Sequence, residues 1–168
     1  MNVKAYLDQH RVDYKVYPHA EECDAAHAAA ALHVPGANFA KTVLLRADHG
    51  FRYVVVVLPS TSRLDLERVR AALGGADLRL ATELEVVERN PGCEAGVLTP
   101  FGSQIGADTI ADASLAEHAD LFFGGDNHQE CIRLNFHEYC RLEHPLILAV
   151  AESGVKTPRC DETHVGGR

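Results

Sequence analysis

Three segments of this chain carry residue types that could do chemistry where a strand or a turn would present them. The first contains Lys41, which shares one face of a predicted strand with Val43 and Leu45, because side chains alternate along a strand. A lysine at the head of such an apolar row either lies at the sheet rim, with its stem along the apolar surface, or points into a pocket. Spacing alone favours the rim.

The second segment is a loop rich in turn formers, Asn90-Pro91-Gly92-Cys93-Glu94-Ala95-Gly96, which continues to Thr99-Pro100-Phe101-Gly102. Glycine lets the backbone approach a ligand closely, so that amides and carbonyls become available as polar groups. The alternative is an ordinary irregular connection. Cys93 has no base in a recognisable pattern with it, which favours a buried or incidental thiol over a nucleophile.

The third segment, Phe123-Gly124-Gly125-Asp126-Asn127-His128, directly follows an apolar strand. A glycine pair and then a histidine at a strand end can place an imidazole at the mouth of a site. There it could transfer a proton or donate a hydrogen bond near neutral pH. A histidine on a surface loop is the alternative.

Metal and cofactor sites have little support in the sequence. His137, Cys140 and His144 would align only if one helix ran through all three, and Pro145 ends that helix. The chain has no H-E-x-x-H, C-x-x-C, Walker A or G-x-G-x-x-G motif and no serine nucleophile elbow. We therefore expect no metal and no cofactor.

Composition is that of one globular domain in a reducing compartment. The 168 residues are 46% hydrophobic and 24% charged, and the five cysteines form no C-x-x-C pair. No apolar run approaches the length of a membrane span and the N-terminus lacks a secretory pattern, so we expect a cytoplasmic protein that binds no membrane. The net charge of −8 argues against a protein that coats DNA or RNA, but permits recognition of one RNA end by a local basic patch.

The elements that must position the three segments alternate between helix and strand. Helices are predicted over residues 2–10, 25–33, 62–75, 82–88 and 136–142, with Asp24 as one N-cap and a capping box from Thr82 to Glu85. Strands are predicted over residues 14–17, 41–47, 51–58, 105–110, 121–123 and 131–136, followed by an apolar run at 146–150.

The fold class follows from how these elements are connected. Asp48-His49-Gly50 predicts a hairpin turn between the two strongest strands, and four successive valines from Val54 make the second of them apolar on both faces and therefore central. We expect an α+β fold, a single domain with a mixed or mainly antiparallel sheet flanked by helices. The domain is predicted over residues 1–145, with a partly mobile C-terminal extension at 146–168.

Taken in order, the three segments resemble the YbaK/ProX family of aminoacyl-tRNA deacylases, which includes free-standing enzymes and the editing domain of some prolyl-tRNA synthetases. The resemblance rests on Ala40-Lys41-Thr42-Val43-Leu44-Leu45, on the 91–96 and 99–102 loop, and on Gly124-Gly125-Asp126-Asn127-His128-Gln129-Glu130 before Ile132-Arg133-Leu134. It covers about residues 3–143, including the segment 29–36 before the lysine.

The resemblance implies hydrolysis of the ester that joins a small amino acid to the 3′-terminal ribose of a mischarged tRNA. The partner would be the aminoacyl-tRNA 3′ end, with an aminoacyl-tRNA synthetase as a further candidate. The family's residues map onto catalytic Lys41, Gly102 and His128, and onto substrate-binding Pro100, Phe101, Gly124 and Gly125. Asp126 and Asn127 depart from the shorter segment of many relatives.

Such an enzyme needs a placed water and a stabilised oxyanion but no protein nucleophile, which fits the absence of a triad pattern. Two alternatives stay open at this point. The same fold could serve as a non-catalytic module that binds an amino acid or aminoacyl-tRNA, or as an esterase or thioesterase for small molecules.

Overall fold

The centre of the structure is a pair of antiparallel strands, β2 (Phe39–Ala47) and β3 (Arg52–Pro59). The computed structural model describes residues 2–20, 25–47 and 52–152, so the predicted hairpin turn at 48–50, Phe51 and the predicted cap Asp24 lie outside the described residues. Val54, Val55, Val56 and Val57 of β3 are all 0% exposed, and β3 lies between β2 and β5. The central position predicted from the two-sided apolar sequence is confirmed.

One mixed sheet contains all the described strands, in the order β1-β7-β6-β2-β3-β5-β8, with β4 paired to β2 beside this path. The further strands are β1 (Tyr14–Pro18), β4 (Leu78–Leu80), β5 (Asp108–Asp112), β6 (Asp120–Gly124), β7 (Glu130–Asn135) and β8 (Leu146–Leu148). Strand β2 runs parallel to β6, and β5 runs parallel to β3 and β8, whereas the remaining pairs are antiparallel. The predicted single α+β domain with a mixed sheet is confirmed.

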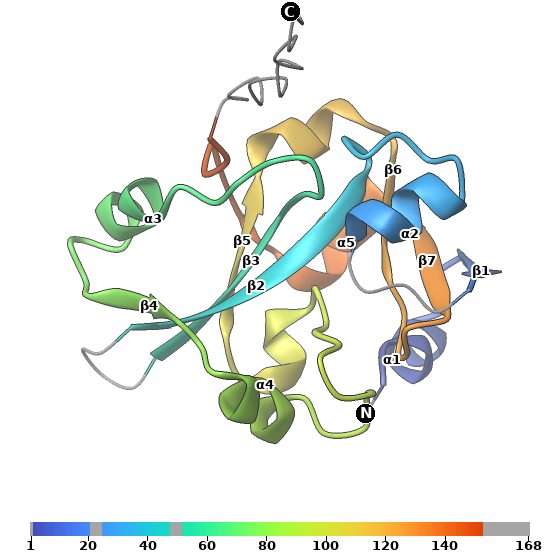
Figure 1. Cartoon of the computed structure of the whole chain (residues 1–168), viewed down its shortest axis with the longest axis horizontal. Coiled ribbons are helices and arrows are strands. Elements are labelled where there is room, and N and C mark those ends of the chain that lie inside the picture. The colour runs from blue at the N-terminus through green and yellow to red at the C-terminus, as the bar shows by residue number, and fades with distance from the viewer. Residues whose placement is uncertain (1, 21–24, 48–51, 153–168) are drawn as a thin grey trace, which may run out of the picture.

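Helices cover both faces of the sheet (Figure 1). Helices α1 (Val3–Gln9), α4 (Glu83–Arg89) and α5 (Phe136–Glu143) pack on the face that includes Leu44, whereas α2 (Ala25–Ala31) and α3 (Leu66–Ala72) pack on the face that includes Leu45. Successive residues of β2 thus enter different cores, because side chains alternate along a strand. No helix within the described residues is long and apolar enough to cross a membrane.

The structure differs from the sequence predictions at two strands. The strand predicted at 105–110 is wrong in its first half, because residues Gly102–Ile105 form a 3-10 helix and Gly106 adopts the left-handed conformation (φ 68°), so that β5 begins only at Asp108. Strand β4 was not predicted, since three residues are too few to show an alternating pattern.

The C-terminal part of the described chain joins the sheet. Strand β8 pairs with β5, Val150 is 1% exposed, and the amide of Val150 donates to the Asp112 carboxylate at 2.8 Å. Residues 146–152, which the sequence analysis assigned to an extension, therefore pack onto the domain. The rest of that extension, 153–168, lies outside the described residues.

Local signals fixed several helix ends. The predicted capping box is present, with Thr82 and Glu85 each bonded to the other's backbone N–H at the start of α4. The Glu85 carboxylate also accepts from Arg79, Arg46 and Tyr53. These bonds, that of Arg79 above all, hold the pKa of Glu85 far below its usual range.

A buried carboxylate joins α5 to the 3-10 turn and to β5. Glu143 is only 9% exposed, and it accepts hydrogen bonds from the Ser103 amide at 3.0 Å, from the Ser103 hydroxyl at 2.6 Å and from the Thr109 hydroxyl. A buried charged group is tolerated only when it is hydrogen-bonded in this way.

Replacement of Glu143 by alanine should therefore destabilise the fold by about 2–3 kcal/mol, because it leaves buried donors without an acceptor. The measurement is urea unfolding of the two proteins. Glu138→Ala on the same helix is the control, since it breaks only a surface pair with Arg141 and should cost at most about 1 kcal/mol. Equal losses in the two variants would contradict this account.

Candidate functional site

A cavity opens where two parallel strands part. Strands β2 and β6 pair at only two positions, Phe39 with Phe122 and Ala40 with Phe123. Further along, from Leu45, the same edge of β2 pairs with β4. The cavity between the two strands has a volume of about 150 Å³, which is enough for a benzene-sized group.

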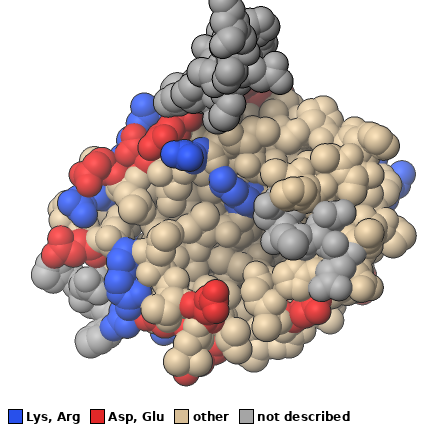
Figure 2. All heavy atoms as spheres, viewed as in Figure 1, with Lys and Arg blue, Asp and Glu red and all other residues tan. Residues whose placement is uncertain are grey.

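The lining of this cavity combines two kinds of residue. Some are apolar, namely Ala28, Phe39, Ala40, Val97 and Leu98, and others are polar, namely His19, Thr42, Asn127, His128 and Glu130. Gly96 and Gly124 complete the lining. Figure 2 shows a hollow near the middle of the face in view, bordered mostly by uncharged residues, with a basic side chain close beside it. The arrangement suits a small molecule that has both an apolar and a polar part.

Lys41 stands beside this opening. It is the first residue of β2 after the two that pair with β6, and it is half-buried. Its neighbours Ala40 and Thr42 line the cavity, whereas Lys41 itself is not among the lining residues and shares the face of Val43 and Leu45. The backbone of Lys41 therefore lies at the rim of the split between β2 and β6.

The Pro-Phe-Gly turn lies in the core and does not line the cavity. Phe101 is fully buried against the rings of Tyr6, Phe123 and Tyr139, and the Pro100 carbonyl accepts from the Tyr139 hydroxyl at 3.0 Å.

Gly102 is likewise engaged within the protein. Its amide donates to the Thr109 hydroxyl at 3.1 Å and its carbonyl accepts from the Ala107 amide at 2.9 Å. A Cβ added to Gly102 would collide with the Thr109 hydroxyl and lie 2.9 Å from the Ala107 carbonyl. The backbone groups that the family resemblance offered to a substrate are thus occupied at Gly102.

Gly96, rather than Gly102, is the glycine of this loop that lines the cavity. It has φ of 86°, a conformation that favours glycine. A Cβ at Gly96 would lie 3.7 Å from the His128 ring. The imidazole Nε2 of His128 lies 2.9 Å from the Ala95 carbonyl, and the His128 amide donates to the Glu94 carboxylate at 2.8 Å. The loop and the glycine–histidine segment, about thirty residues apart in sequence, therefore meet at the cavity.

The two glycines before His128 differ in role. Gly124 lines the cavity, and a Cβ there would meet nothing within 4 Å. Gly125 is buried against the Glu130 side chain, and its amide donates to the Glu130 carbonyl at 2.9 Å. Gly124 can face a ligand, whereas Gly125 shapes the turn.

Sequence reasoning missed several lining residues. His19 directly follows β1, and its Nδ1 lies 2.6 Å from the Ala20 carbonyl. A histidine after a strand end was the signal used for His128, and it would have found His19 too. Alternation places Thr42 on the face of β2 opposite Lys41, but it gave no reason to expect a cavity there. Ala28, on α2, gave no signal of its own in an alanine-rich helix.

Cys93 lies near the site as a thiol. Its Sγ donates to the Asp126 carboxylate at 3.7 Å, and the pKa of Cys93 is raised by burial and by the Asp126 charge. A raised pKa disfavours the thiolate form that a nucleophile needs.

The residues considered for metal binding do not align. Helix α5 ends at Glu143, and His144 adopts the left-handed conformation as its C-cap, so that it leaves the helical face of His137 and Cys140. Within residues 2–20, 25–47 and 52–152, no group of three His, Cys, Asp or Glu side chains could hold a metal ion.

Residues 19–142 match the family model described as the aminoacyl-tRNA editing domain. The chain is 26% identical over 127 residues to a proline--tRNA ligase of Brachyspira hyodysenteriae, an alignment that covers 75% of this chain. The chain spans only about a fifth of that ligase's length, since the match covers 22% of it.

Two solved structures share the fold. The hypothetical protein APE2540 superposes with a TM-score of 0.78 at 22% identity, over 89% of this chain and 99% of that one. A proposed trans-editing enzyme for prolyl tRNA synthetase superposes with a TM-score of 0.75 at 22% identity, over 90% of this chain and 95% of that one. At this identity the likeness shows the fold.

Two glycine variants should separate structural from lining positions. Gly102→Ala should destabilise the protein by about 1–3 kcal/mol, because its methyl group would collide with Thr109, whereas Gly124→Ala should change stability by about 0.5 kcal/mol at most. Thermal and urea unfolding measure both. A stable Gly102→Ala protein would show that this turn is not packed as described.

Proposed function

Because the chain belongs to the aminoacyl-tRNA editing domain family, we propose that it hydrolyses the ester bond of a mischarged aminoacyl-tRNA and releases a small amino acid. The observation that carries this proposal is the cavity between β2 and β6, whose lining offers apolar residues to a small side chain and polar residues to the charged and reacting groups. Editing sites of this size select by exclusion, since binding alone separates small side chains poorly.

The proposed reaction needs no covalent intermediate. A water oxygen attacks the ester carbonyl carbon, the bond between that carbon and the 3′ ribose oxygen breaks, and the ribose oxygen takes a proton. The rate depends on a placed water and on stabilisation of the negative charge that develops on the carbonyl oxygen.

Roles can be proposed for the residues around the cavity. Lys41, at the rim, would bind the terminal phosphate or ribose or stabilise the developing charge. His128 would act as a donor or in proton transfer, held in place by Glu94 and Ala95. Gly124 and the backbone at Gly96 would contact the substrate. Gly102, Pro100, Phe101 and Gly125 would support the site from within the core and the turn.

The test is a panel of mischarged tRNAs offered to the purified protein. The likeness to a proline--tRNA ligase makes tRNA for proline, charged with small non-cognate amino acids, the first substrate to try. Release of the amino acid supports the proposal. Binding without release would identify a non-catalytic module, and equal hydrolysis of simple amino-acid esters without the RNA would identify a small-molecule esterase.

Lys41→Ala should lower the deacylation rate about 100- to 1000-fold, the usual loss when one contact to the transition state is removed. The variant should keep its fold, because Lys41 is only half-buried. Lys15→Ala is the control, since Lys15 is exposed on β1 away from the cavity, and it should leave the rate unchanged. Near-normal turnover in a folded Lys41→Ala protein would remove Lys41 from the site.

Contact with tRNA should involve few basic side chains. The arginines of the central strands and of α3 are engaged within the protein. Each forms an ion pair with a carboxylate of the same chain: Arg46 on β2, Arg52 on β3, and Arg68 and Arg70 on α3. Phosphates would have to compete with these carboxylates, on a protein whose net charge is −8.

Binding of a non-hydrolysable aminoacyl-tRNA analogue should therefore depend weakly on salt. The slope of log K against log salt concentration should be about one per phosphate contact. The measurement compares affinity at low and physiological ionic strength. A steep slope, or equal affinity for uncharged RNA of any sequence, would contradict local recognition.

A further inference from the structure

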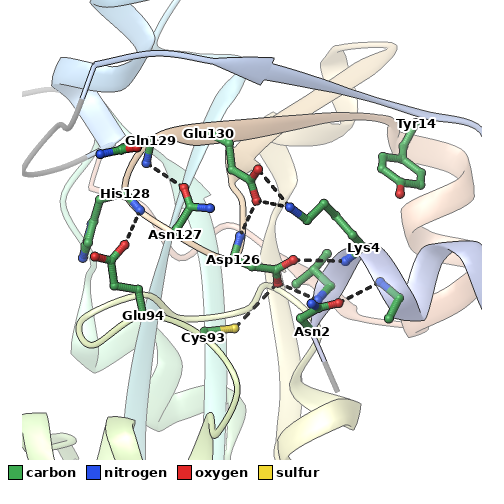
Figure 3. Close-up of polar contacts among 12 residues, drawn as sticks. Asn2, Lys4, Tyr14, Cys93, Glu94, Asp126, Asn127, His128, Gln129 and Glu130 are labelled. Atoms are coloured by element: carbon green, nitrogen blue, oxygen red, sulfur yellow. Dashed lines mark hydrogen bonds and ion pairs between the residues drawn. The ribbon is translucent and has the colours of Figure 1, made fainter.

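A buried aspartate in the turn between β6 and β7 contacts two other parts of the chain (Figure 3). Asp126 is 8% exposed, and its carboxylate accepts from the amide of Val3 at 2.7 Å and from the amide of Lys4 at 3.4 Å, both in the first turn of α1. The same carboxylate accepts from the Cys93 thiol at 3.7 Å. Burying a carboxylate is costly unless donors such as these surround it.

The same turn holds α1 at a second point. Glu130, which lines the cavity, forms an ion pair with the Lys4 ammonium at 2.7 Å and accepts from the Asp126 amide at 3.1 Å. The hydrogen bond to Glu130 raises the pKa of Lys4. The start of α1 is thus fixed to the turn by both of its acidic residues.

The turn is also closed onto the loop that carries Gly96. The Asp126 carbonyl accepts from the Glu94 amide at 3.0 Å, and the Glu94 carboxylate accepts from the His128 amide at 2.8 Å. The His128 ring also contacts the Ala95 carbonyl. Several polar contacts therefore join residues 93–96 to residues 126–128 (Figure 3). Gly96 and His128 both line the cavity at this junction.

We propose that Asp126 is a positioning residue for the reaction, one that fixes the 93–96 loop and His128 against the N-terminal end of α1 and so sets the geometry of the cavity wall. The proposal rests on the function proposed above.

Asp126→Ala should lower kcat for deacylation about 100-fold with little change in KM, because a displacement of the catalytic groups by about 1 Å has an effect of this size. Asp126→Asn should retain most of the wild-type kcat, since its amide oxygen can still accept the shorter of the two bonds, from the Val3 amide. This conservative variant also keeps the proposal testable if the alanine protein fails to fold.

Asn2→Ala is the matched control. Asn2 caps the same helix by accepting from the Ala5 amide at 2.9 Å, so its side-chain oxygen is bonded within α1. Its loss should lower the unfolding temperature without lowering kcat. If Asn2→Ala reduces kcat as strongly as Asp126→Ala, or if Asp126→Ala keeps the wild-type kcat, Asp126 only supports the helix and the proposal is wrong.

A second readout does not depend on enzymatic activity. Asp126→Ala should speed hydrogen exchange of the Glu94 and His128 amides, and Asn2→Ala should leave both rates unchanged. If the wild-type protein hydrolyses no tRNA in the panel but these amides respond as expected, the proposed function fails while the positioning role stands. Unchanged exchange in Asp126→Ala would reject that role as well.

Discussion

Strand β2 pairs with two different strands along one edge, and the geometry of the candidate site depends on that constraint. Its other edge is paired with β3 at every position from 40 to 47, which fixes the course of β2 through the centre of the sheet. The edge facing β6 pairs with β6 only as far as Ala40, and it meets β4 only from Leu45. Positions 41–43 lie between these two partners in the described ladder, and the cavity lies beside them.

Such a parting of strands supplies what a small-molecule site needs. An edge between two partners presents backbone and side chains without a neighbouring strand to cover them, and the loop at residues 96–98 forms the facing wall. The strands themselves are rigid, because both faces of β3 are buried in separate cores. The position of the site is thus set by backbone pairing, whereas its chemistry comes from loops.

Polar contacts orient those loops. The buried carboxylates Asp126 and Glu143 each connect segments that are distant in sequence. Asp126 joins α1 to the 93–96 loop, and Glu143 joins α5 to the 3-10 turn at Gly102–Ile105. Loops carry few apolar contacts, so hydrogen bonds must hold their conformation. Bonds to buried carboxylates are suited to this, because a buried group cannot exchange its protein partners for water. Apolar packing thus fixes the strands, whereas hydrogen bonds to buried carboxylates fix the loops around the cavity.

The sequence by itself determined the elements with strong periodic or capping signals. The central strand with its four valines, the capping box at Thr82 and Glu85 and the mixed α+β class follow from local pattern, and the structure agrees. The three segments that carry the family resemblance were also found in order, and two of them, with Gly124 and His128 and with the 90–102 loop, do meet at one cavity.

Only the tertiary structure decided which residues of those segments face the cavity. Alternation places Lys41 and Thr42 on opposite faces, but it cannot say on which face a cavity opens, since that depends on where β6 leaves β2. Gly96 and Gly102 look equivalent as glycines in one loop, yet packing against Thr109 fixes one in the core while the other lines the cavity. Asp126 binds residues more than a hundred positions away, and contacts between parts so distant in the chain leave no local pattern to read.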